Sequence, residues 1–363
     1  MAGSRPINLG IVGFGEWGPN HARSFSNLPH ARLVGIADPS PERLEAARQR
    51  FREVRTFKSH KDLMKTVPLD AVVVATPAST HANIVRDALE AGLHVLCEKP
   101  LCLELEEAEG LIQLADAQSL ILMVGHIFLF NAGILKLRRF IQERELGAIQ
   151  YLNCQRTNLG PIRRDVSVIW DLASHDISIT NFLLNTLPIQ VSAVGHSYLR
   201  HGIQDVAFIT LTYPDNVLAH VHVSWLDPMK VRKITVVGDR KMVTWNDLSS
   251  FGPIRLFDKG VIKERHYADF GQFQLLTRDG DVMIPRISME EPLIVQSRHF
   301  LAALQRKEDC VTNGRFGLDV LKVMLAIDRS IAAGGACSPV SEFSESDQQK
   351  LAERWPRAAL PSI

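Results

Sequence analysis

Two hydrophobic patterns divide the chain. Up to about residue 125, short apolar runs such as Ile7–Val12 and Asp70–Thr76 alternate with segments whose apolar residues recur at helical spacing, as in Leu105–Ala115. From about Ile149 the pattern changes, and Val217–Trp225 is apolar at every second position. The first pattern predicts a doubly wound parallel sheet and the second an antiparallel one.

The predicted fold class is therefore α/β followed by α+β: an N-terminal Rossmann doubly wound parallel sheet, then a C-terminal open, mainly antiparallel sheet domain. We expect a first domain at residues 1–125, a second at 126–342 and a peripheral charged tail at 343–363. Further strands are expected near 190–199, 205–213, 231–237 and 241–245, and helices near 170–184, 291–306 and 316–333.

Composition narrows the class of protein. The chain has 363 residues, which fits two domains, and its 41 basic and 40 acidic residues do not favour nucleic-acid or membrane partners. The most apolar window, Leu120–Phe130, is too short to span a bilayer and is predicted to be a buried strand. Five cysteines without a C-x-x-C pair argue against a disulfide scaffold or structural zinc, so we expect a cytoplasmic protein.

A glycine-rich turn follows the first strand. Its sequence is Gly13-Phe14-Gly15-Glu16-Trp17-Gly18. Gly13 permits a tight turn, Gly15 lets a pyrophosphate approach, and Gly18 allows close packing of the following helix. That helix would point its N-terminal amides at the anion. Trp17 is expected either in the core or beside the ligand.

An acidic residue completes the dinucleotide pattern. Asp38 ends the second predicted strand, where a carboxylate can accept both ribose hydroxyls of an adenosine and repel a 2′-phosphate. Pro39 and Ser40, rather than arginine, follow it, and Arg43 lies one turn further on. The pattern predicts a site for NAD in preference to NADP.

Two segments are candidates for the reaction itself. Glu98-Lys99-Pro100 lies at the carboxyl end of a predicted strand, where ligands of such sheets bind, although a solvated turn is the alternative. Asp171 and His175 share one face of a predicted helix, where the imidazole can remove a hydroxyl proton and the carboxylate can support its charge. A surface histidine and a two-ligand metal site are the alternatives, but no third ligand is evident and no metal is expected.

Other polar residues have two interpretations each. The arginines and the asparagine could hold a diphosphate or carboxylate, or be solvated surface groups. Two histidines on one predicted strand face fit a half-exposed sheet or a subunit contact. These residues are Arg156, Asn158, Arg163 and Arg164 for the anion, and His220 and His222 for the strand.

Together these motifs resemble the Gfo/Idh/MocA oxidoreductases, in an order that matches over nearly the whole chain. The motifs are the glycine turn, Asp38, Ala75-Thr76-Pro77, Glu98-Lys99-Pro100 and the Asp171/His175 spacing. The resemblance implies that Lys99 is the active-site lysine, with a cis Lys99–Pro100 bond, and that Asp171 and His175 are the catalytic pair. It also implies a homodimer or homotetramer. The residues it places along the cofactor are Thr76, Pro77, His81 and Glu98.

One region departs from the common pattern. Val166–Val168 stands where many members have a Gly-Gly pair, and Leu159–Asp165 looks like the nucleotide-sugar members, in particular UDP-N-acetylglucosamine and UDP-N-acetylglucosaminuronate 3-dehydrogenases. The resemblance implies NAD-dependent oxidation of a sugar hydroxyl, most specifically at carbon 3 of a UDP-N-acetyl-hexosamine or its uronate. His175 would take the hydroxyl proton and Lys99 would orient the hydroxyl.

Three other functions stay open at this point. The first is a simple sugar or inositol dehydrogenase. The second is a non-catalytic NAD-sensing protein of the same fold. The third is an enzyme that uses transient oxidation to drive elimination or glycoside cleavage, with the cofactor tightly retained.

Overall fold

The structure, a computed structural model, describes residues 5–160, 162–163, 166–263, 275–288 and 290–340. The described chain forms two compact units, one with residues 5–130 and 290–321 and the other with 131–288 and 322–340. The boundaries 1–125 and 126–342 stay a prediction, and the tail at 343–363 lies outside the described residues.

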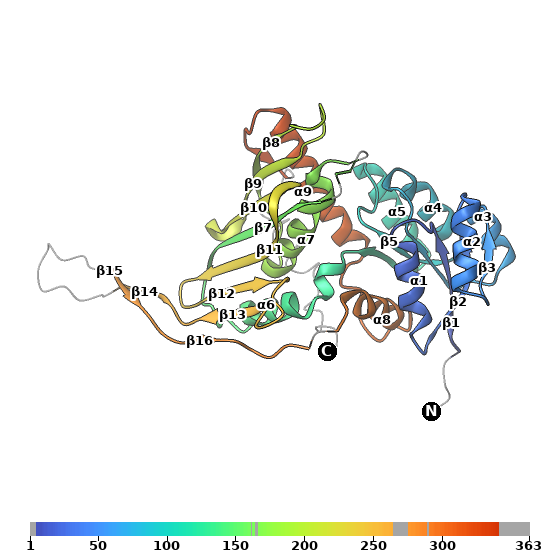
Figure 1. The fold of residues 1–363 in the computed structure, drawn as a ribbon, viewed down its shortest axis with the longest axis horizontal. Coiled ribbons are helices and arrows are strands. Elements are labelled where there is room, and N and C mark those ends of the chain that lie inside the picture. Colours follow the sequence, from blue (N-terminus) through green and yellow to red (C-terminus); the bar gives the residue numbers. More distant parts are fainter. Residues whose placement is uncertain (1–4, 161, 164–165, 264–274, 289, 341–363) are drawn as a thin grey trace, which may run out of the picture. The chain divides into compact units, whose positions relative to one another are not determined.

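The first unit is built on a six-stranded parallel sheet with the order β3-β2-β1-β4-β5-β6 (Figure 1). The predicted doubly wound sheet is confirmed. The strand order reverses between β1 and β4, and ligands of such sheets bind beyond the strand ends at this point. The strands are β1 Ile7–Val12, β2 Ala31–Ala37, β3 Arg55–Phe57, β4 Ala71–Val74, β5 His94–Glu98 and β6 Leu122–Gly125.

Helices connect these strands, and local chemistry sets where they begin. Ser40 precedes Pro41 at the start of α2, and its Oγ accepts a hydrogen bond from Arg43 N (3.3 Å). A capping hydroxyl and a proline at the first helical position therefore set the beginning of this helix. A later helix, α8, returns to this unit and packs against α1. The helices are α1 Gly18–Ser26, α2 Pro41–Arg50, α3 His60–Thr66, α4 His81–Glu90, α5 Leu105–Ala117 and α8 Pro292–Leu304.

The apolar window at 120–130 is only partly a strand. β6 stops at Gly125, which is paired with Glu98 at the last position of β5. His126 N then donates to Val124 O (2.8 Å), which turns the chain, and Ile127–Phe130 forms a short 3₁₀ helix. The strand ends where its partner ends, although the apolar sequence continues. Within the described part of the chain, no helix is long and apolar enough to cross a membrane.

The second unit contains a nine-stranded sheet with the order β16-β13-β12-β11-β7-β10-β9-β8-β17. Only the β7–β10 pair is parallel, so the sheet is mainly antiparallel as predicted. The strands are β7 Ile149–Leu159, β8 Gln190–His196, β9 Val206–Thr212, β10 Leu218–Ser224, β11 Leu226–Gly238, β12 Met242–Asn246, β13 Ile254–Phe257, β16 Val282–Met283 and β17 Ser338–Pro339. A separate ribbon pairs β14 Gly260–Lys263 with β15 Leu275–Arg278.

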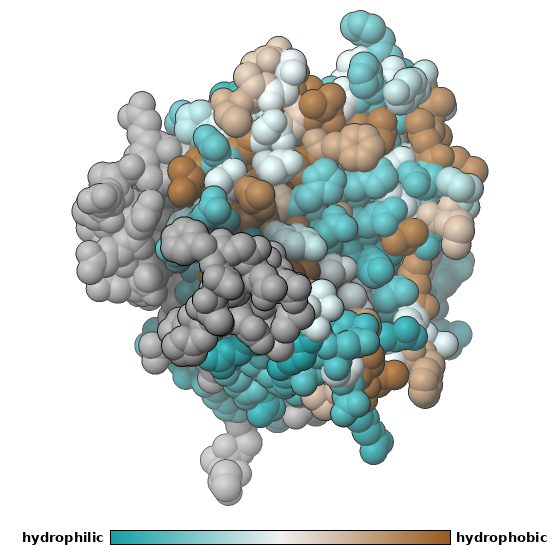
Figure 2. All heavy atoms as spheres, turned by 90° about the vertical axis from the view of Figure 1, so that its left-hand side faces the viewer, coloured by the Kyte–Doolittle hydropathy of each residue, from teal (hydrophilic) through white to brown (hydrophobic). Residues whose placement is uncertain are grey.

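One face of this sheet is buried and the other carries exposed residues. Along β10, Ala219, Val221 and Val223 are fully buried, as the alternating pattern predicts. Phe208 on β9 is half-exposed, and its ring stacks on that of His222 with centroids 4.5 Å apart. Figure 2 shows one face of the molecule, on which hydrophobic and hydrophilic residues are interspersed. The unit also contains α6 Ala132–Gln142 and α7 Ser174–Leu184. The helix α9, Gly314–Ala332, belongs to this unit from Lys322 onward.

Gly133 in α6 allows this helix to approach β12. A Cβ atom at Gly133 would lie 2.3 Å from Nε1 of the buried Trp245. We expect Gly133→Ala to lower the free energy of unfolding by about 1–3 kcal/mol, because the indole must move. Gly110→Ala is the control: no atom lies within 4 Å of the added Cβ in α5, so it should stabilise by about 0.5–1 kcal/mol. Chemical denaturation measures both, and equal effects would contradict the packing argument.

Candidate active site

The glycine turn is shaped by close main-chain contacts. Gly13 has a φ of +92°, and a Cβ atom there would lie 2.5 Å from Ala75 O. A Cβ atom at Gly18 would lie 2.0 Å from Gly13 O. At Gly15, by contrast, the nearest atom is Arg43 Nη1 at 3.6 Å. Gly13 and Gly18 therefore close the turn, and Gly15 leaves room on its outer side.

The start of α1 suits an anion. No side chain of the described residues caps its N-terminus, and no acidic residue lies in its first turn. Backbone amides and the positive end of the helix dipole therefore face the region beside Gly15. Trp17 is 37% exposed, which excludes the core as its place, whereas Phe14 is buried against Phe51. The turn fits a pyrophosphate. The buried Phe14 side chain anchors the turn in the core and does not line the surface that faces the ligand.

Asp38 supports the turn from the end of β2. Its Oδ2 accepts a hydrogen bond from Phe14 N (2.7 Å) and its Oδ1 accepts one from Ser40 N (2.9 Å). Arg43 Nη1 lies 3.5 Å from Oδ2. The carboxylate is only 3% exposed, so besides any ribose contact it fixes the glycine turn against β2. The sequence did not reveal this second role.

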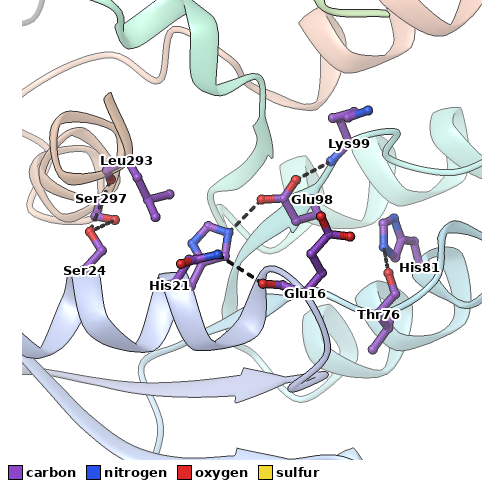
Figure 3. A network of polar contacts seen from close by, with 10 residues as sticks. Glu16, His21, Ser24, Thr76, His81, Glu98, Lys99, Leu293 and Ser297 are labelled. Atoms are coloured by element: carbon purple, nitrogen blue, oxygen red, sulfur yellow. Dashed lines mark hydrogen bonds and ion pairs between the residues drawn. The ribbon is translucent and has the colours of Figure 1, made fainter. Parts of the chain in front are cut away.

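Lys99 lies on the turn after β5, and its bond to Pro100 is cis as expected. Glu98 Oε2 accepts a hydrogen bond from Lys99 N (3.3 Å), and Oε1 lies 2.7 Å from His21 Nε2. Figure 3 shows this chain of contacts, in which the Lys99 side chain points away from the Glu98 carboxylate. His21 belongs to α1 and was not singled out in the sequence, because no motif marks it.

His81, expected along the cofactor, is buried. Its Nδ1 lies 2.7 Å from Pro100 O and its Nε2 lies 2.9 Å from Thr76 O. Its ring therefore links the turn after β4 to the turn after β5. Thr76 and Pro77 themselves lie on the first of these turns and are partly or fully exposed.

A second histidine near Lys99 was also missed. His126 follows β6 and is 2% exposed, and neither ring nitrogen has a hydrogen-bond partner among the described residues. Burial and, to a smaller extent, the charge of Lys99 lower the pKa of His126 to about 3. The ring is therefore neutral at physiological pH.

In the second unit, Asp171 and His175 follow each other along one helical stretch. Asp171 lies in a π-helical turn, Ile169–Ala173, and His175 is the second residue of α7. Such turns are frequent at functional sites. Asp171 Oδ2 accepts a hydrogen bond from Trp225 Nε1 (3.3 Å), and Oδ1 lies 3.5 Å from Arg163 Nη1. The structure thus brings one predicted arginine, Arg163, to the predicted carboxylate.

Arg156 is placed differently from what the sequence suggested. It lies on β7 with 3% exposure, and its Nε and Nη2 donate to the two carboxylate oxygens of Asp176 at 2.8 and 3.0 Å. Asp176 is 1% exposed. A guanidinium that is buried and paired in this way fits the core better than a substrate contact. Asn158 is half-buried near the end of β7, and Arg164 lies outside the described residues.

The parallel sheet, the glycine turn and Asp38 define a dinucleotide-binding protein. The model of the oxidoreductase family with an NAD-binding Rossmann fold, Gfo/Idh/MocA, matches residues 7–126, and that of the Gfo/Idh/MocA C-terminal domain matches residues 134–244. The chain belongs to the Gfo/Idh/MocA family of oxidoreductases.

Several relatives with curated functions are dehydrogenases. UDP-N-acetylglucosamine 3-dehydrogenase from Acidithiobacillus ferrooxidans is 31% identical over 242 residues, which are 66% of this chain and 72% of the relative. Inositol 2-dehydrogenase 2 from Paenarthrobacter aurescens is 33% identical over 225 residues, 59% of this chain and 67% of the relative. The solved structure of the former enzyme, GnnA, has a TM-score of 0.76 and 26% identity, over 91% of this chain and 99% of that one. These relatives place the chain among dehydrogenases that act on CH–OH groups of sugars, nucleotide sugars or inositols.

The Arg156–Asp176 pair predicts a structural effect. We expect Arg156→Met to lower the free energy of unfolding by about 3–5 kcal/mol, because it leaves Asp176 as a buried, unpaired charge. Arg139→Met is the control and should leave the free energy of unfolding nearly unchanged, since the Arg139–Glu143 pair is exposed to solvent. The double variant Arg156→Met/Asp176→Leu should recover most of the loss. A stable Arg156→Met variant with a raised KM would instead make Arg156 a substrate contact.

Proposed function

We propose that this protein is an NAD-dependent dehydrogenase that oxidises the 3-hydroxyl of a UDP-N-acetyl-hexosamine or its uronate. The observation that carries the reaction type is the position of Lys99. It directly follows β5 at the carboxyl edge of the sheet, in the same unit as a glycine turn that fits a pyrophosphate. The substrate class is supported by the 31% identity to UDP-N-acetylglucosamine 3-dehydrogenase.

The proposed roles follow from the chemistry of each group. The glycine turn and Asp38 would hold NAD, which would supply the acceptor for the hydride of the alcohol carbon. Oxidation also releases the hydroxyl proton, and His175 takes it as general base. The Lys99 ammonium donates a hydrogen bond to the hydroxyl oxygen and stabilises the negative charge that develops there. The carboxylate of Asp171, held by Trp225, supports the charged imidazole.

Substrate and coenzyme selection are assigned to separate units. Arg163 and Asn158 are proposed to contact the substrate, and Arg156 is left out because it is buried and paired with Asp176. Asp38 favours NAD over NADP, although the exposed Arg43 beside it offers a cation to a 2′-phosphate. A homo-oligomer is part of the proposal and is supported by exposed apolar residues on β7–β10. These residues are Tyr151, Val194, Phe208 and Leu218.

An inositol or simple sugar dehydrogenase is the second candidate. The 33% identity to inositol 2-dehydrogenase 2 favours it, and the same Lys99 and His175 roles would apply. The two candidates differ in the reacting ring, which is a carbocycle in inositols and a pyranose in hexosamines, and in the UDP group that only the nucleotide sugar carries.

NADH formation tests the proposal directly. We expect turnover with UDP-N-acetylglucosamine or its uronate, and a loss in kcat of about 10²- to 10⁴-fold in Lys99→Ala and in His175→Ala. Lys61→Ala and His201→Ala change exposed residues outside the proposed site and should match the wild type. Turnover of inositols alone would select the second candidate.

Two further outcomes would reject the proposal itself. If wild-type turnover survives in Lys99→Ala and His175→Ala, the assigned roles are wrong. If NAD binds but no sugar or inositol yields NADH, an NAD-sensing protein or an enzyme with retained cofactor takes its place.

A further inference from the structure

The residues on both sides of Lys99 are each held by a buried histidine. Glu98, before it, is bound by His21 from α1, and Pro100, after it, is bound by His81 from α4. Figure 3 shows the two histidines on opposite sides of the Glu98–Lys99 segment. Neither contact involves the lysine side chain. His81 contacts the main chain directly at Pro100 O, and His21 reaches it through the Glu98 carboxylate, which accepts a hydrogen bond from Lys99 N.

The contact from α1 has a defined direction. The His21 side chain is fully buried and Glu98 is 12% exposed, with 2.7 Å between Nε2 and Oε1. An ionised carboxylate only accepts hydrogen bonds, so Nε2 is the donor. The other oxygen, Oε2, accepts from Lys99 N at 3.3 Å. Glu98 therefore connects α1, which begins at the glycine turn, to the main chain of Lys99.

The contact from α4 uses both nitrogens of His81. Its partners, the carbonyl oxygens of Pro100 (2.7 Å) and Thr76 (2.9 Å), have no proton to give. A neutral ring has one N–H and donates to one of the two oxygens, whereas an imidazolium donates to both. In either form the ring lies between the turn after β4 and the turn after β5 and contacts both.

We propose that His21 and His81 are positioning residues that fix Lys99 relative to the two cofactor-binding turns. This inference rests on the role proposed for Lys99 above. A lysine side chain has four rotatable bonds, so the position of its ammonium depends on the main chain at residues 98–100 being fixed. A displacement of about 1 Å at a reacting group can cost about 10²-fold in rate. The histidines would act on kcat through Lys99 and would leave the affinity for NAD nearly unchanged.

Substitution of His81 by asparagine or glutamine tests its two contacts one at a time. The amide nitrogen of asparagine can replace Nδ1 toward Pro100, and that of glutamine can replace Nε2 toward Thr76. Since the Pro100 bond is the one beside Lys99, we expect His81→Gln to lower kcat about 10- to 100-fold and His81→Asn to lower it less. Equal losses in the two variants would contradict a specific role for the Pro100 bond.

The same reasoning applies to His21. His21→Gln keeps a donor near Nε2 and should retain most of kcat, whereas His21→Leu should lower it about 10- to 100-fold. His60→Leu is the matched control, because His60 Nε2 also contacts a carboxylate, Asp87 Oδ2 at 2.8 Å, away from Lys99. Calorimetry should give an NAD dissociation constant within about threefold of wild type in each variant, since the glycine turn is unchanged.

A double-variant cycle decides whether the effect passes through Lys99. With UDP-N-acetylglucosamine as substrate, His21→Leu should lower kcat when it is the only substitution. Added to Lys99→Met, it should cause no further loss. If Lys99→Met abolishes turnover and His21→Leu behaves like His60→Leu, the positioning role is wrong and the proposed function stands. If Lys99→Met keeps wild-type turnover, the role of Lys99 in the proposed function is wrong.

Hydrogen exchange gives a readout that does not need turnover. In the NAD complex, the Lys99 amide should exchange faster in His21→Leu and His81→Gln than in wild type and His60→Leu, because its main-chain segment is less restrained. Equal exchange in all four proteins would overturn the proposal even if no sugar is turned over.

Discussion

The approach of one main-chain segment to another at Gly13 is the constraint on which the cofactor site depends. A Cβ atom there would lie 2.5 Å from Ala75 O, so any side chain would push the turns after β1 and β4 apart. These turns meet because β1 and β4 are neighbours at the point where the strand order reverses. Asp38 then fixes the arrangement by accepting a hydrogen bond from Phe14 N. The phosphate-binding turn and the turn that carries Thr76 are thus placed by one contact.

Much of the first unit could be predicted because its strands are short, continuous apolar runs separated by strong helix signals. β5 ends at Glu98, where the sequence predicted the end of a strand. The second unit was harder. β7 was not predicted as a strand because its apolar alternation is interrupted where two polar residues, Arg156 and Thr157, are buried. The partner of Arg156, Asp176, is twenty residues away, and a sequence pattern gives no sign of that pairing.

The site residues were easier to find than their contacts. The sequence singles out positions such as Phe14, His81 and Arg156, but it does not say where a side chain points. In all three the structure shows internal contacts: Phe14 packs in the core, His81 lies between two carbonyl groups, and Arg156 pairs with a carboxylate. Conversely, His21 lacks a motif, and its contact with Glu98 depends on α1 and β5 being close in space. A polar residue in a motif can therefore serve the backbone of the site rather than its ligand.

The His21 and His81 contacts link the placement of the cofactor to the placement of Lys99. α1 begins at the glycine turn and α4 follows the turn that carries Thr76, so the elements that shape the cofactor site also hold Glu98 and Pro100. A shift of either helix would therefore move the lysine as well as the cofactor. Arg163 and Asn158, the residues proposed above to contact the substrate, belong to the other unit and take no part in these two histidine contacts. Substrate preference can accordingly change in the second unit while the geometry between cofactor and lysine is kept, which fits a family whose members oxidise both nucleotide sugars and inositols.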